Sequence, residues 1–110
     1  MNGSVYEGMW NMGLRDGYGR LIHPTGDMYQ GDWMGDKANG HGVFSNLDGY
    51  CYEGNWVNDC QDGQGKETWD SNNSNYVGYF KNSKKNGHGR YEWADGSYYD
   101  GNFMNGVFEG

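Results

Sequence analysis

The chain has 110 residues, of which only 35% are hydrophobic while 17% are aromatic, so rings rather than aliphatic side chains must supply most of the buried surface. Its formal net charge is -7 at pH 7 and its longest basic run is Lys84-Lys85. This composition argues against nucleic acid and anionic lipid as ligands, because both are bound through clustered Lys and Arg. No stretch is typical of a membrane helix or a signal peptide, which predicts an intracellular, cytoplasmic protein.

A five-fold repeat runs along the whole chain. A Tyr-x-Gly motif recurs at steps of 23, 23, 24 and 23 residues, beginning at Tyr6, Tyr29, Tyr52, Tyr76 and Tyr99. A period of this length is typical of stacked units that are each too small to bury a core alone. We therefore predict one array over residues 1–110, with units at 6–28, 29–51, 52–75 and 76–98 and an incomplete unit at 99–110.

Each unit opens with the pattern of a β-strand. In the first unit Tyr6, Gly8 and Trp10 alternate with other residues and so share one face of an extended chain. The six residues between Trp10 and Gly17 include turn-forming Asn, Gly and Asp. The chain is expected to reverse there and to start a second strand at Gly17.

The second strand of each unit starts at a Gly-x-Gly motif and ends at a hairpin signal. That signal is Thr25-Gly26 in the first unit and Asp-Gly in the second and fourth. In the third unit Asn72-Asn73 stands in its place, and one extra residue predicts a longer turn or a bulge. The sequence thus predicts an all-β fold, an antiparallel meander of about ten strands with almost no helix.

The two faces of the predicted sheet differ in chemistry. A glycine inside a strand lets a neighbouring ring lie flat over bare backbone, so we expect the Gly-x-Gly positions to receive the Tyr and Trp rings. This makes one face aromatic. The other face carries mostly Glu, Gln, Asp and Asn, with Val77 and Tyr79 as exceptions, and should be in contact with water.

These motifs resemble the MORN-repeat family. Tyr6-Glu7-Gly8-Met9-Trp10, with Gly13, Gly17 and Gly19, matches the pattern of that family position by position. Later units depart from it: Asp36, Asp59 and Ser83 replace the glycine at position 13, and Phe80 and Phe103 replace Trp. The resemblance covers essentially the whole chain. It implies an elongated, twisted, mostly single-layer antiparallel sheet with a groove lined by aromatic residues.

No residue pattern indicates catalysis, a cofactor or a metal site. His41 and His88 occupy a repeat position that Tyr18 and Gln64 fill in other units, so histidine chemistry is not required there. The sequence lacks the closely spaced Cys and His pairs of a zinc site. The two cysteines, at different repeat positions, are interpreted as free thiols.

The aromatic face is the candidate site, because a single-layer sheet has no second layer to cover it. We predict a non-enzymatic scaffold that binds an extended or helical segment of a partner protein with basic residues; the resemblance implies cytoskeletal or ciliary assemblies. Two alternatives remain: a membrane or phospholipid-associated module, disfavoured by the charge, and the regulatory repeat region of an enzyme such as a lipid kinase or methyltransferase. The candidate groove residues are Trp10, Trp33, Phe44, Trp56, Trp69, Phe80, Tyr91, Trp93 and Phe103, and all of them except Phe80 and Phe103 are expected to stay partly exposed.

The chain ends suggest a segment of a longer array. Gly110 matches the first glycine of a Gly-x-Gly motif whose strand does not follow, so Tyr99 to Phe103 is predicted to lack a hairpin partner. An unpaired terminal strand exposes its main-chain donors and acceptors. We therefore expect the last unit to fray after about Tyr98 or to pair with another chain, which would permit self-association through the sheet ends.

Overall fold

The computed structural model describes residues 3–109 and shows one open antiparallel sheet, without helix in that range. Its ten strands lie in chain order, so the predicted all-β meander is confirmed. The strands are β1 (Val5–Asn11), β2 (Leu14–Ile22), β3 (Met28–Met34), β4 (Lys37–Ser45), β5 (Tyr50–Val57), β6 (Cys60–Trp69), β7 (Ser74–Lys81), β8 (Lys84–Glu92), β9 (Tyr98–Met104) and β10 (Val107–Glu109).

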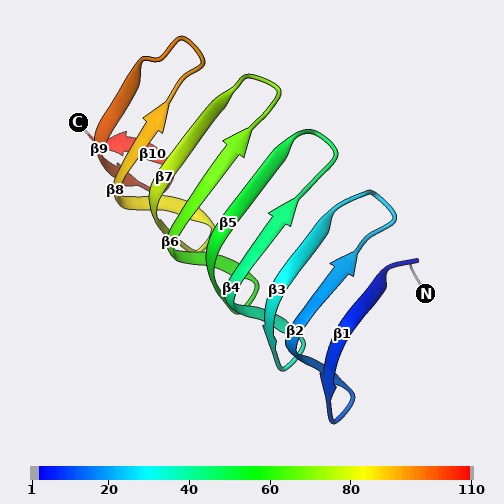
Figure 1. Cartoon of the computed structure of the whole chain (residues 1–110). Helices are drawn as coiled ribbons and strands as arrows, with labels where there is room; N and C mark the ends of the chain where they lie inside the picture. The colour runs from blue at the N-terminus through cyan, green and yellow to red at the C-terminus, as the bar shows by residue number, and fades with distance from the viewer. Residues whose placement is uncertain (1–2, 110) are drawn as a thin grey trace.

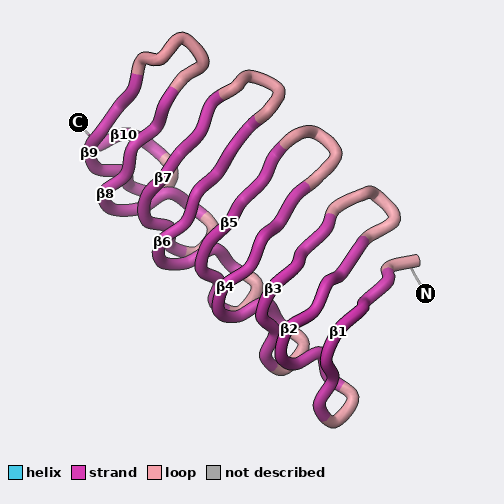
Figure 2. The backbone as a smooth tube through the Cα atoms, viewed as in Figure 1, coloured by secondary structure: helices cyan, strands magenta, loops and turns pink. Residues whose placement is uncertain are grey.

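The molecule is elongated, with principal extents of 47 × 25 × 18 Å. Figure 1 shows the hairpins standing side by side in a row, with the two ends of the chain at opposite ends of that row. Each strand is nearly straight toward one margin and curls over toward the other, as the tube in Figure 2 makes plain. The sheet therefore forms a trough with an inner and an outer face.

The curl begins at a glycine bulge in the first hairpin of each of the first four units. Pairing between β1 and β2 is regular up to Gly8↔Gly19 and then shifts to Trp10↔Arg15. Gly17 lies in the bulge with φ +94, and the same shift and a positive φ recur in the next three units. A left-handed glycine at a bulge bends the strand and increases its twist.

The prediction that the second strand starts at Gly17 is wrong, because the turn is shorter than expected. Met12 and Gly13 form it alone, with φ of 52 and 81, and β2 begins at Leu14. Two consecutive residues with positive φ are the hairpin turn that fits the twist of a sheet. The same two-residue turn recurs in every unit.

The repeat tyrosines lie over glycines, but within each Gly-x-Gly motif only the second glycine receives the ring. One row of glycines crosses the sheet from Gly8 through Gly19 and Gly31 to Gly101, each paired with the next. A Cβ added at Gly19 would lie 2.2 Å from the Tyr6 hydroxyl, so the ring uses that space. The first glycine of each Gly-x-Gly motif instead supplies the bulge, which corrects the expectation that both receive rings.

The extra residue of the third unit lengthens its hairpin loop rather than forming a bulge. Pairing between β6 and β7 continues without a shift to Trp69↔Ser74, at the end of the longest strand. Four residues, 70–73, then separate Trp69 from Ser74, whereas three separate the equivalent His23 and Asp27 in the first unit, and Asn73 adopts a positive φ of 54. Of the two predicted alternatives, the longer turn is the one that forms.

The last unit does have a hairpin partner, so the prediction of an unpaired Tyr99 to Phe103 is wrong. β10 pairs with β9 from Val107↔Met104 onward, because the tight turn at Asn105 and Gly106 lets a strand start well before the Gly-x-Gly position. Gly110 itself lies outside the described residues. Fraying in solution stays a prediction.

The outer face is in contact with water, as predicted. The apolar exceptions expected there, Val77 and Tyr79, are 50% and 46% exposed, and Tyr18 on the same face is 54% exposed. Cys51 and Cys60 are free thiols, in agreement with the sequence interpretation. The buried rings form one cluster, which lies on the inner face of the trough.

Candidate binding groove

A continuous ladder of rings forms the floor of the trough. Tyr29 meets Trp33 of its own unit edge to face at 5.1 Å and Trp56 of the next unit at 5.2 Å between ring centroids. The pattern repeats from Trp10 to Tyr99. Edge-to-face contact is a preferred geometry for aromatic pairs. Each tyrosine hydroxyl also donates to the carbonyl three residues later, as Tyr29 does to Asp32 at 2.9 Å.

A second row of rings flanks this ladder along the straight arms of the hairpins. Tyr50 lies 5.7 Å from Trp69, which lies 5.7 Å from Tyr91, and Trp93 follows at 4.8 Å. Phe44 extends the row toward the N-terminus, 6.1 Å from Tyr50. The trough is thus aromatic on its floor and along one wall.

The predicted groove residues separate into three groups by exposure. Trp10 and Trp93 are exposed, at 58% and 38%, whereas Phe44, Trp69 and Tyr91 are half-buried. The expected partial exposure of Trp33 and Trp56 is wrong, because flanking rings leave only 6% and 8% of them in contact with solvent. The remaining two candidates, Phe80 and Phe103, are also buried.

One repeat position that the sequence reasoning missed points into the trough. It is the second residue after the two-residue turn, and it carries Arg15, Ala38, Gln61 and Lys85 in the first four units. The signal was the same 23-residue phase that revealed the tyrosines. The variety of residue types hid it, since a varied column resembles a surface position.

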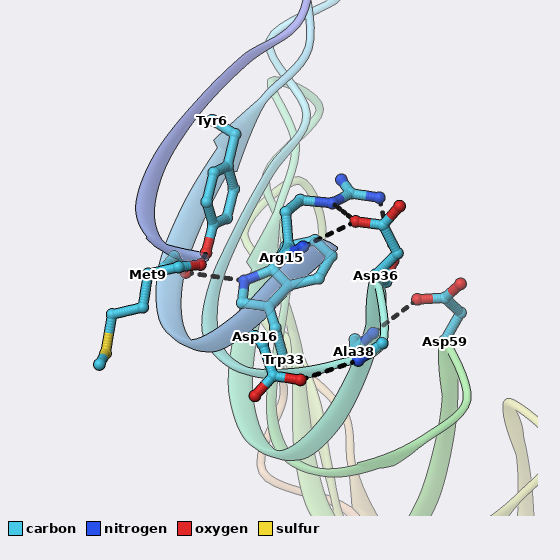
Figure 3. A network of polar contacts seen from close by, with 10 residues as sticks. Tyr6, Met9, Arg15, Asp16, Trp33, Asp36, Ala38 and Asp59 are labelled. Carbon is cyan, nitrogen blue, oxygen red and sulfur yellow. Dashed lines mark hydrogen bonds and ion pairs between the residues drawn. The ribbon is translucent and has the colours of Figure 1, made fainter. Parts of the chain in front are cut away.

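Arg15 is held through both its side chain and its backbone, and Figure 3 shows its hydrogen bonds to Asp36. Its guanidinium carbon lies 4.4 Å from the centre of the Trp33 ring, a cation–π contact. Its Nε donates to Asp36 Oδ1 at 2.9 Å and an Nη donates to the Asp36 carbonyl at 2.9 Å. The backbone N–H of Arg15 donates to the same Asp36 carboxylate at 2.9 Å.

These hydrogen bonds give Asp36 a measurable pH signature. The backbone and side-chain N–H groups of Arg15 lower the pKa of the Asp36 carboxyl in the folded state. Their contribution to stability is therefore complete above the unfolded-state pKa of about 4 and is lost as pH falls through the lower folded value. The stability advantage of the wild type over Asp36→Asn should shrink from pH 6 to pH 2 in urea denaturation. Asp48→Asn, in an exposed loop, is the control, and an advantage that does not depend on pH would contradict this assignment.

Equivalent hydrogen bonds join the later units. Ala38 donates its backbone N–H to Asp59 Oδ1 at 2.7 Å, and Gln61 donates to the Ser83 hydroxyl at 3.1 Å. In return the N–H of each turn residue donates to the earlier unit, as Asp59 does to the Ala38 carbonyl at 3.0 Å. The Asp and Ser residues that replace the family glycine therefore link neighbouring units through hydrogen bonds.

Three of the four side chains at this position fill the trough. Lys85 lies over Trp69 at 5.1 Å and pairs with the buried Glu67 at 3.3 Å. Gln61 donates to the Tyr50 hydroxyl at 2.9 Å, and Arg15 covers Trp33. Ala38 is too short to do so. An open cavity of about 370 Å³ lies beside it, lined by Leu21, His23, Tyr29, Trp33, Phe44, Tyr50, Trp56, Asp59, Gln61 and Ser83.

The buried phenols of the trough are uncharged. Burial raises the pKa of Tyr76 to about 12 and that of Tyr29 and Tyr52 further, so these phenols stay neutral at physiological pH. Within residues 3–109 no three His, Cys, Asp or Glu side chains are placed to hold a metal ion. The same part of the chain contains no helix long and apolar enough to span a membrane.

The fold and the row of rings along the trough define a repeat protein of stacked β-hairpins. A model of the MORN repeat matches residues 6–28, 29–49, 52–74, 76–98 and 99–110. The chain therefore belongs to the MORN-repeat family, as its motifs predicted. Repeats of this family are generally non-catalytic modules for interaction with proteins or membranes. No curated protein matches the chain.

Proposed function

We propose that this chain is a non-enzymatic interaction module whose trough holds a segment of a partner protein with basic residues. The observation that supports this most is the open cavity among the rings of the inner face, next to the carboxylates of Asp36 and Asp59. The extent of 47 Å would accommodate about 14 residues of an extended chain. A cytoskeletal or ciliary assembly is the setting we favour.

Charge favours a protein partner over an anionic membrane. The chain carries 15 acidic and 8 basic residues. Two of its cations, Arg15 and Lys85, are engaged with carboxylates inside the trough. An anionic vesicle therefore meets a repulsive surface, while a basic segment is attracted. Strong binding to anionic vesicles at physiological salt, with no peptide bound in the trough, would overturn the proposal.

The proposal is tested by selecting peptide ligands from a random display library with the whole chain. Trp93→Ala removes an exposed ring of the inner face, and Tyr79→Ala removes a similarly exposed ring of the outer face. We expect Trp93→Ala to weaken the selected peptides about tenfold, as truncation of an aromatic binding anchor does, and Tyr79→Ala to leave them within about twofold. Equal effects of the two variants would place the binding surface elsewhere.

A further inference from the structure

We propose that the cavity beside Ala38 receives the guanidinium of an arginine side chain supplied by the partner segment. This inference rests on the proposed function and names the chemistry of its central contact. It follows from the internal repeat: Arg15 already occupies the equivalent place one unit earlier, so the chain itself shows how such a group is held.

The partners of Arg15 all recur around Ala38. Each of these partners has an equivalent one unit later in the chain. The equivalents of Tyr6, Trp33 and Asp36 are Tyr29, Trp56 and Asp59, and all three equivalents line the cavity. The Arg15 guanidinium lies 5.9 Å from the Tyr6 ring centre and 4.4 Å from that of Trp33. The same two faces, with a carboxylate beside them, are present at the second site.

The framework of the second site is already formed. The N–H of Ala38 donates to Asp59 Oδ1 at 2.7 Å, as that of Arg15 does to Asp36 Oδ1 at 2.9 Å. The indole N–H of Trp56 donates to the Gly42 carbonyl at 3.1 Å, the same geometry as that of Trp33 with Gly19. Only the side chain at position 38 is missing, and Figure 3 shows Ala38 and Asp59 beside the complete Arg15 site.

The geometry favours a guanidinium over an ammonium. Arg15 donates through two nitrogens to two different oxygens of Asp36, one in the side chain and one in the backbone. A planar fork can do this, whereas a lysine offers a single point of charge. Where the chain uses a lysine, at Lys85, the adjacent turn carries Gly106 instead of an acid and Glu67 supplies the charge from another strand.

The charge around the cavity is complementary to a cation. Asp59 lines both this cavity and an adjoining hollow of about 400 Å³, and in that hollow Arg15 is already paired with Asp36, so the charge left for a further cation is that of Asp59. Among residues 3–109 no side chain pairs with the second carboxylate oxygen of Asp59. An incoming guanidinium thus finds one carboxylate oxygen and two ring faces.

Ala38→Arg tests the inference by filling the cavity from within. Arg15 shows that the site accepts this side chain, so we expect a melting temperature at or above that of the wild type. Peptides selected by the wild type should contain an arginine whose change to lysine lowers affinity about tenfold, and Ala38→Arg should lower their affinity at least as much. His41→Arg, which adds the same charge on the exposed outer face, should leave affinity within about twofold.

Asp59→Asn keeps the acceptor for Ala38 and removes the charge, so it tests the same site if Ala38→Arg fails to fold. It should also weaken the arginine peptides about tenfold. Peptides that need Trp93 but no arginine, and that bind Ala38→Arg and Asp59→Asn as tightly as the wild type, would overturn the arginine site and leave the groove function intact. A selection that yields no groove-dependent peptide would overturn both.

Discussion

Gly65→Ala is expected to destabilise the array by about 3 kcal/mol, at the upper end of the range for overpacking a core. A Cβ at this position would lie 2.3 to 2.5 Å from the hydroxyl and ring atoms of Tyr52. That ring is fully buried, and it lies between Trp56 at 5.1 Å and Phe80 at 5.0 Å. Its hydroxyl also donates to the Asn55 carbonyl at 2.8 Å. The ring therefore has nowhere to move, and the backbone of β6 must yield.

Urea denaturation of purified Gly65→Ala measures this cost. The matched control is Gly35→Asn, because a Cβ at Gly35 meets no atom within 4 Å and Asn58 already adopts φ 47 at the equivalent turn position. The control should change the free energy of unfolding by less than about 0.5 kcal/mol, as surface substitutions usually do. A cost below about 1 kcal/mol for Gly65→Ala would show that Tyr52 does not need the bare backbone.

Local patterns predicted the hairpins, their order and the polar outer face, because alternation and turn chemistry act within a few residues. They could not distinguish two kinds of glycine. Gly17 is needed for its positive φ in a bulge, while Gly19 is needed for the space under Tyr6. Both belong to the same Gly-x-Gly motif, so the sequence does not separate their two roles. The curl of the trough depends on the first kind, and the sequence did not show it, so Trp33 was expected to be more exposed than it is.

The cavity at Ala38 could not be predicted from local patterns at all. An alanine in a strand carries no signal of its own. Its importance comes from Trp56 and Asp59, which approach from the next unit, and from the long side chains Arg15 and Lys85 at equivalent positions. Aligning the units by their period places these residues in one column. Only the fold shows that the column points into the trough.

Trp33→Ala is expected to cost about 3–5 kcal/mol, the range for truncating a large buried aromatic residue. The indole is 6% exposed and contacts Tyr6 at 5.6 Å and Tyr29 at 5.1 Å. Arg15 covers its face, and its N–H donates to the Gly19 carbonyl at 3.1 Å. The substitution therefore opens a cavity, breaks the ring ladder between two units and leaves a half-buried guanidinium without its ring.

Trp10→Ala is the matched control, since Trp10 holds the same repeat position at the end of the ladder. It is 58% exposed and contacts Tyr6 from one side, so its removal should cost less than about 1 kcal/mol. Urea denaturation of both variants, followed by circular dichroism and tryptophan fluorescence, measures the difference. If Trp33→Ala also costs less than about 1 kcal/mol, the interior ring contributes little to the fold, and its role would then be to contact the partner directly.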